Sequence, residues 1–66
     1  MKLHINGEAR EAPGLATVAD LAAWLEVPNF GSAIELNGAV IRRVDHPGTP
    51  LKDGDRLEVV RLVGGG

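Results

Sequence analysis

Cysteine is absent from this chain of 66 residues, and aromatic residues are scarce, with one tryptophan, one phenylalanine and no tyrosine. Without cysteine the chain cannot form a persulfide, a thioester or a cysteine-ligated metal site from its own residues. Small secreted domains usually rely on disulfides, so the absence of cysteine favours a cytoplasmic protein. Seven scattered Lys and Arg with two aromatics also do not form a nucleic-acid surface, and we expect no nucleic-acid partner.

Long hydrophobic runs and nucleotide-binding loops are missing as well. No stretch approaches the ~20 apolar residues that span a bilayer, so we expect no membrane association. The chain has no GxxxxGK[ST] phosphate loop and is therefore not expected to use ATP itself. His4 and His46 have no further ligands at metal-binding spacing, and Asp53-Gly54-Asp55 lacks the additional oxygen ligands of a calcium loop. We therefore expect these residues at turn or surface positions. We expect no metal site and no bound cofactor.

The residues that are present predict one folded domain, because 44% are hydrophobic and the formal net charge is only -2. Apolar and polar residues alternate over residues 1–5, which predicts a half-buried strand. Asn6-Gly7 is a strong signal for a two-residue hairpin, so a return strand is expected from Glu8 to about Pro13.

A short amphipathic helix should follow. Thr17 and Asp20 have the spacing of a capping box, with Asp in place of the usual Glu. Pro28 disfavours helical geometry at the preceding residue, so the helix should end near Glu26. Trp24 borders the apolar stripe and is expected at the edge of the core. The stripe itself consists of Val18, Leu21, Ala22 and Leu25.

The second half predicts more strands and turns. A second Asn-Gly pair, Asn37-Gly38, separates residues 33–36 from 39–42 and indicates a second hairpin or a strand with a short edge segment. Residues 45–50 have turn chemistry, and the final strand should run from Arg56 to about Val63. One helix can cover only one face of a sheet, so these elements predict a small α+β roll.

The final strand is apolar on both faces over its second half. Val60 and Leu62 lie on the face opposite Leu57 and Val59, and two interpretations of that face remain open. It is either packed beneath loops or exposed as a docking patch for a partner. Arg42-Arg43 is a weaker candidate for contact with an acidic partner, because paired arginines beside a turn are usually solvated.

The sequence ends on three glycines, Gly64 to Gly66. Three residues without Cβ form a flexible tether of about 10 Å, and a glycyl carboxylate has an uncrowded carbonyl carbon. At neutral pH this carboxylate is ionised and resists nucleophilic attack until it is activated, for example as an acyl-adenylate. Because the chain lacks a nucleotide loop, a partner enzyme must perform the activation. We therefore expect a carrier and substrate rather than an enzyme.

The order of elements, the stretch LKDGDRLEV at 51–59 and the ending VGGG at 63–66 together resemble the sulfur carriers of thiamine biosynthesis. The segments Leu36-Asn37-Gly38 and Ile41-Arg42-Arg43 are similar to a family stretch before the last hairpin. The resemblance covers the whole chain. It implies a ubiquitin-like β-grasp domain at residues 1–63, with a mixed sheet of four to five strands packed on one helix, and a flexible tail at 64–66.

What the resemblance implies for function is sulfur transfer through Gly66. An E1-like adenylyltransferase would adenylate Gly66 with ATP, and a persulfide-bearing sulfurtransferase or cysteine desulfurase would supply the sulfur. The resulting thiocarboxylate would donate sulfur to thiazole synthase. Gly65 and Gly66 match the family's terminal glycine pair, and Gly64 extends the segment that presents it.

Three other functions share the same sequence features. Molybdopterin synthase small subunits have the same fold and ending, but they tend to carry prolines where this chain has Arg61-Leu62-Val63. A ubiquitin-like modifier would be conjugated to lysines of other proteins through Gly66. A plain β-grasp binding module would carry an inert glycine tail.

Overall fold

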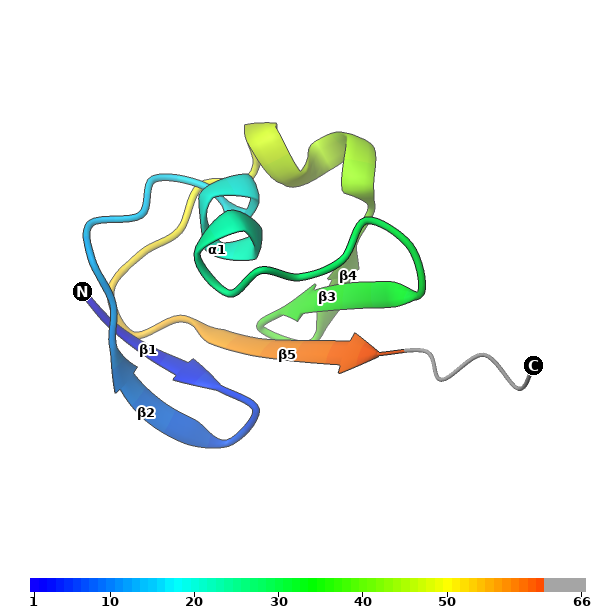
Figure 1. The fold of residues 1–66 in the computed structure, drawn as a ribbon. Coiled ribbons are helices and arrows are strands. Elements are labelled where there is room, and N and C mark those ends of the chain that lie inside the picture. Colours follow the sequence, from blue (N-terminus) through cyan, green and yellow to red (C-terminus); the bar gives the residue numbers. More distant parts are fainter. Residues whose placement is uncertain (62–66) are drawn as a thin grey trace.

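The structure, a computed structural model, describes residues 1–61. Their elements follow one another as two strands, a helix, two strands, a 3-10 helix and a last strand (Figure 1). Their bounds are β1 Lys2–Ile5, β2 Glu8–Glu11, α1 Val18–Trp24, β3 Ser32–Leu36, β4 Ala39–Ile41, η1 Arg43–Gly48 and β5 Arg56–Arg61. None of the helices formed within residues 1–61 has the length and apolarity needed to cross a membrane.

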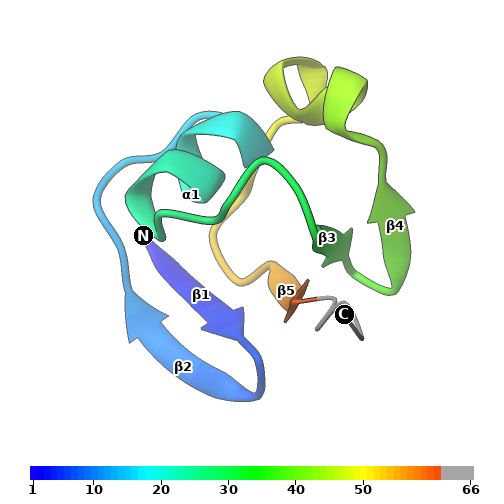
Figure 2. The same cartoon turned by 45° about the vertical axis from the view of Figure 1, so that its right-hand side comes forward.

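The strands form one mixed sheet in the order β2-β1-β5-β3-β4. The central strand, β5, runs parallel to its neighbour β1, and all other neighbouring pairs are antiparallel. Both α1 and η1 lie on the same side of this sheet, and the opposite face carries no helix in the described part of the chain (Figures 1 and 2). The prediction of one mixed sheet of four to five strands with an α-helix on one face is confirmed.

Two Asn-Gly turns set the register of the hairpins. Asn6 and Gly7 have φ values of 50° and 83°, and Asn37 and Gly38 have φ values of 51° and 89°. These values are those of type I′ turns, whose twist matches that of the flanking strands. The second turn joins β3 and β4 as an antiparallel hairpin, which decides between the two interpretations of this segment.

The start of α1 has the predicted capping box. Thr17 Oγ1 accepts a hydrogen bond from the Asp20 N–H at 3.3 Å, and Asp20 Oδ2 accepts one from the Thr17 N–H at 3.2 Å. Val18 and Leu21 are fully buried, with Ala22 and Leu25 packed beside them. Trp24 is half-buried at the edge of the core, as expected.

The helix ends at Trp24, two residues before the predicted end. Val27 N–H donates to the Ala22 carbonyl at 2.9 Å, and Glu26 N–H donates to the Ala23 carbonyl at 3.1 Å. This is the Schellman pattern of a helix end, and Glu26 occupies the left-handed position with φ 55°. Glycine or asparagine usually fills that position, so the glutamate gave no sequence signal for the earlier end.

The core lies between α1 and the sheet. Leu3 and Ile5 from β1, Leu57 from β5 and Ile34 from β3 meet Leu21 of the helix, and each is at most 5% exposed. Strand β2 ends at Glu11 rather than near Pro13. Ala12 still exchanges hydrogen bonds with Met1, since its N–H donates to the Met1 carbonyl and its carbonyl accepts from the Met1 ammonium, each at 2.7 Å. Pro13, which follows, has no N–H with which to extend a ladder.

The turn chemistry predicted at 45–50 belongs to a short helix that was not predicted. Residues 43–48 form the 3-10 helix η1, with Pro47 inside it. The Asp45 N–H donates to the Arg42 carbonyl at 2.8 Å, and Thr49 Oγ1 donates to the Asp45 carbonyl at 2.6 Å. These local bonds complete successive tight turns, a form that turn-forming residues alone do not distinguish from an irregular loop.

Candidate functional site

The candidate site is the end of β5, from which the chain continues toward the glycines. Leu62 and the predicted reactive segment Gly64, Gly65 and Gly66 lie outside the described residues, as does the boundary between the domain at 1–63 and the tail at 64–66. The geometry of the site therefore comes from β5 and its neighbours.

Val60 lies on the sheet face opposite α1. It is 40% exposed and sits opposite Ala33 of β3. In the described part of the chain both helices lie over the other face (Figures 1 and 2), so no loop or helix packs over Val60. Val60 is therefore exposed within residues 1–61, whereas Leu62, the other apolar residue predicted for this face, lies outside them. Docking of a partner on this face stays a prediction.

The sheet face opposite α1, the outer face, also carries acidic side chains. Glu58 of β5 lies directly opposite Glu35 of β3, and Glu35 in turn lies opposite Val40 of β4, which is 65% exposed. Like charges in directly opposed positions destabilise a sheet. The outer face is therefore a mixture of exposed valines and a carboxylate pair that no described cation neutralises.

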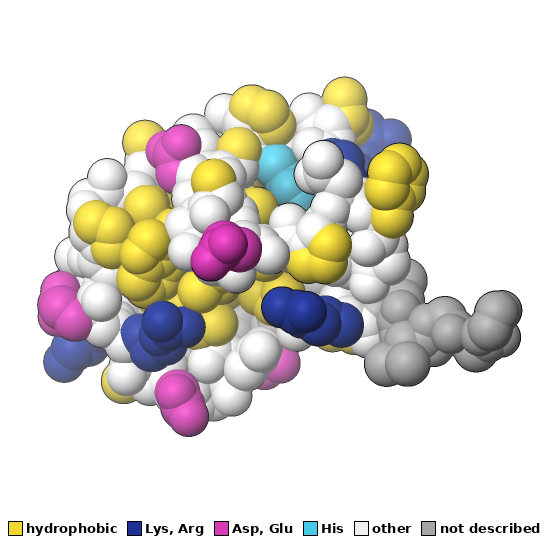
Figure 3. Space-filling model, viewed as in Figure 1, with side chains coloured by type: hydrophobic (Ala, Val, Ile, Leu, Met, Phe, Trp, Pro, Cys, Tyr) yellow, Lys and Arg dark blue, Asp and Glu magenta, His cyan; other side chains and the backbone are white. Residues whose placement is uncertain are grey.

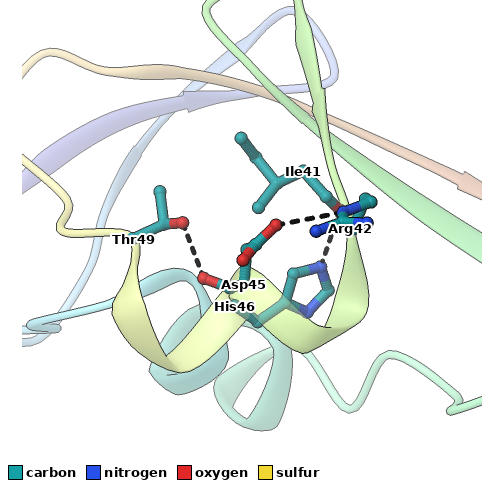
Figure 4. Close-up of polar contacts among 5 residues, drawn as sticks. All are labelled: Ile41, Arg42, Asp45, His46 and Thr49. Atoms are coloured by element: carbon teal, nitrogen blue, oxygen red, sulfur yellow. Dashed lines mark hydrogen bonds and ion pairs between the residues drawn. The ribbon is translucent and has the colours of Figure 1, made fainter.

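Arg42 is engaged within its own segment. Its Nε donates to Asp45 Oδ2 at 3.2 Å, at the beginning of η1, and both side chains remain more than half exposed (Figure 4). Beside this pair, His46 Nε2 lies 3.0 Å from the Ile41 carbonyl oxygen. These contacts hold η1 onto the end of β4, which gives Arg42 a local structural role.

Arg43 faces a different neighbour. Its guanidinium carbon lies 6.0 Å from the centroid of the Phe30 ring, which is 90% exposed. Strand β3 separates β4, which leads to the arginines, from β5 with Val60. The structure therefore does not join Arg42, Arg43 and Val60 into one patch.

The predicted turn at Asp53-Gly54-Asp55 is confirmed. Asp55 Oδ2 accepts the Lys52 N–H at 2.7 Å, and Asp53 Oδ1 accepts the Lys2 N–H at 2.6 Å. His4 and His46 are both half-buried. Within residues 1–61 no three His, Asp or Glu side chains come together in a way that could hold a metal ion.

Sequence reasoning missed two arginines near the end of β5. Arg10 and Arg61 line a groove of about 440 Å³ whose apolar walls include Leu25 and Val59. The two arginines are 51 positions apart, and neither lies in a charge cluster. Their proximity depends on the pairing of β1 with both β2 and β5, which no local pattern reveals.

Comparison with known proteins identifies the family. The sequence model of the ThiS family matches residues 3–66, which is nearly the entire chain. A protein of Thermus thermophilus named sulfur carrier protein ThiS is 37% identical over 62 residues, covering 94% of this chain and 95% of that protein. The chain belongs to the ThiS family.

A solved structure of a family member agrees with this assignment. The crystal structure of the thiamine biosynthesis protein ThiS from Geobacter metallireducens superposes with a TM-score of 0.82 at 35% sequence identity, with all of both chains covered. The resemblance inferred from the sequence is thereby confirmed for the family and for the β-grasp fold.

Larger proteins also contain a similar segment. A thiazole synthase of Paramagnetospirillum magneticum is 38% identical over all 66 residues of this chain. A thiazole synthase of Magnetococcus marinus is 36% identical over the same length. The chain spans 20% of the length of each.

Proposed function

We propose that this ThiS-family chain carries sulfur for thiamine biosynthesis on the α-carboxylate of Gly66. The observation that carries the proposal is the family match, which extends over residues 3–66 and so includes the three glycines. The Thermus thermophilus relative, matched over 95% of its length, is named a sulfur carrier. The proposal requires that Gly66 bears a free α-carboxylate, which an intact-mass measurement tests directly.

The chemistry begins with activation by a partner. An oxygen of the Gly66 carboxylate attacks the α-phosphorus of ATP in an E1-like adenylyltransferase, and pyrophosphate leaves. The acyl-adenylate has AMP as a good leaving group, which the free carboxylate lacks. The sequence supplies no nucleotide loop, so ATP is the partner's substrate.

Sulfur then replaces AMP. The terminal sulfur of a persulfide, held by a sulfurtransferase or a cysteine desulfurase, attacks the acyl carbon, and AMP leaves with the carbon–oxygen bond electrons. The product is an acyl disulfide. A thiol reductant cleaves its sulfur–sulfur bond, forming a new disulfide with the donor and releasing the Gly66 thiocarboxylate. The absence of cysteine from this chain assigns the persulfide and the thiol to partners.

Thiazole synthase is the proposed acceptor of the sulfur. Two thiazole synthases contain a segment similar to the whole of this chain, which supports a working relation between the two activities. The glycines suit delivery, because without Cβ atoms they offer the least steric hindrance to a narrow active site.

The test is the intact mass of the protein after incubation with a cognate adenylyltransferase, ATP, a persulfide donor and a thiol. We expect a mass gain equal to the replacement of one oxygen by sulfur, and no gain when Gly66 is deleted. Gly14→Ala is the matched control, because an added Cβ at Gly14 meets no atom within 4 Å, and it should retain the gain. Failure of the unmodified protein to gain this mass with an enzyme that adenylates another carrier would refute the proposal.

A further inference from the structure

Strand β5 is paired on both sides only over its first half. Its pairing with β1 covers Arg56 and Leu57, whereas its pairing with β3 continues to Arg61. Beyond Leu57, the side of β5 that faces β1 therefore has no neighbouring strand among the described residues. Figure 1 shows β5 continuing past the end of the β1–β2 hairpin.

The side chain of Asn6 supplies the last hydrogen bond on the side of β5 that faces β1. The Asn6 N–H donates to the Leu57 carbonyl at 2.9 Å, and Asn6 Oδ1 accepts the Val59 N–H at 2.7 Å. Alternate residues of a strand direct their backbone groups to the same side. The Val59 carbonyl and both backbone groups of Arg61 thus point to the side that β1 does not reach, where they form a short open edge.

A groove with basic rims runs beside this open edge. Ile5, Leu25 and Val59 contribute apolar walls to its volume of about 440 Å³, and Arg10 and Arg61 line it as well. The Arg10 guanidinium lies 4.9 Å from the Trp24 ring centroid, a cation–π distance that holds it over the helix. Figure 3 shows hydrophobic surface between two basic groups on this side of the molecule.

Both arginines are available to a partner. Each is exposed, and within residues 1–61 the ion pairs involve Met1 with Glu11 and Arg42 with Asp45, not these two guanidinium groups. An exposed sheet edge is a template for adding a strand, and basic side chains beside it select an acidic one. Backbone bonds supply affinity in such pairing, and side chains supply specificity.

We infer that the open edge of β5 binds an extended acidic segment of the adenylyltransferase, which pairs with Val59 and Arg61 and places a carboxylate between Arg10 and Arg61. This inference rests on the proposed function, because it assigns the segment to the enzyme that acts on Gly66. Gly66 is five positions beyond Arg61, at most about 17 Å of chain, so an enzyme holding Gly66 lies against this end of β5.

The test measures dissociation constants of the adenylyltransferase for purified variants of the full chain. Arg10→Gln and Arg61→Gln should each weaken binding about tenfold, the loss expected for one charge-assisted hydrogen bond. Arg61→Pro should weaken it about fivefold more than Arg61→Gln, because proline also removes the N–H that faces the open side. Arg56→Gln is the control on the same strand and the opposite sheet face, and it should bind like the unmodified protein.

Amide hydrogen exchange provides a second readout. The Arg61 amide should exchange rapidly in the free protein and slow on complex formation. Slow exchange in the free protein would show that the chain itself covers the edge and would overturn the inference. Unchanged affinity of all Arg10 and Arg61 variants would also overturn it, as would weakened binding to thiazole synthase alone.

The two proposals fail separately. Thiocarboxylate formation at saturating enzyme should persist in Arg61→Gln, so a normal mass gain with unaltered affinity would contradict only the docking inference. Conversely, weakened binding of Arg61→Gln in a system where even the unmodified protein gains no sulfur would support docking and contradict the carrier function.

Discussion

The two halves of β5 belong to one strand but have different surroundings. Leu57 in the first half lies between β1 and β3 and is 1% exposed, whereas Val60 in the second half has β3 as its paired strand and is 40% exposed. Leu57 faces α1 and belongs to the core, whereas Val60 faces the opposite side of the sheet. What separates the two halves is the backbone edge, because only the first half has β1 beside it. The strand that contributes Leu57 to the core is also the last element before the glycines in the sequence.

The largest expected effect is the loss of a core side chain in the first half. Leu57→Ala should lower the free energy of unfolding by about 2–5 kcal/mol, because it leaves a cavity beneath α1. Val60→Ala, a truncation on the outer face of the second half, should lower this free energy by less than about 1 kcal/mol, because Val60 is already 40% exposed. Urea unfolding followed by the fluorescence of the single tryptophan, Trp24, measures both. Equal losses would contradict the assignment of Leu57 to the core and of Val60 to an exposed face.

A smaller effect is expected at the border between the halves. Asn6→Gly keeps the positive φ of 50° but removes the oxygen that accepts the Val59 N–H. This substitution should lower the free energy of unfolding by about 1 kcal/mol and accelerate hydrogen exchange of the Val59 amide. Asn6→Asp retains an acceptor and serves as the control. Unaltered exchange at Val59 in the glycine variant would contradict the role of Asn6 in closing the paired side.

The smallest expected change in the free energy of unfolding is on the outer face of the sheet, and it is an increase rather than a loss. Glu58→Lys replaces the carboxylate opposite Glu35 with a cation and should stabilise the protein by about 0.5 kcal/mol at low salt. Added salt should reduce the gain, because both side chains lie at the surface. Glu8→Lys, opposite the apolar Ile5, is the control. An identical gain in both variants would attribute the effect to net charge rather than to the opposed pair.

Much of the fold could be predicted because its signals are local. The alternation over residues 1–5, both Asn-Gly turns and the Thr17–Asp20 capping box each act over a few residues, and the structure contains all of them. The early end of α1 escaped prediction because a glutamate adopts the left-handed conformation at position 26. The 3-10 helix at 43–48 escaped because its residues equally suit an open turn.

The candidate site could be predicted only in part. The glycine ending and the apolar second half of β5 are visible in the sequence, but the open edge is not. It depends on where β1 stops along β5, a position marked by the contact between Asn6 and Val59, which are 53 positions apart. The groove between Arg10 and Arg61 depends on the same long-range register. Local patterns contain no information about such distances along the chain.

The most direct test of the central claim is the intact mass of this protein isolated from cells that are making thiamine. The account predicts a population carrying one sulfur in place of one oxygen at Gly66, which increases when thiazole synthase is depleted. Protein found only with an ordinary carboxylate under that depletion, or only joined to lysines of other proteins through Gly66, would contradict it.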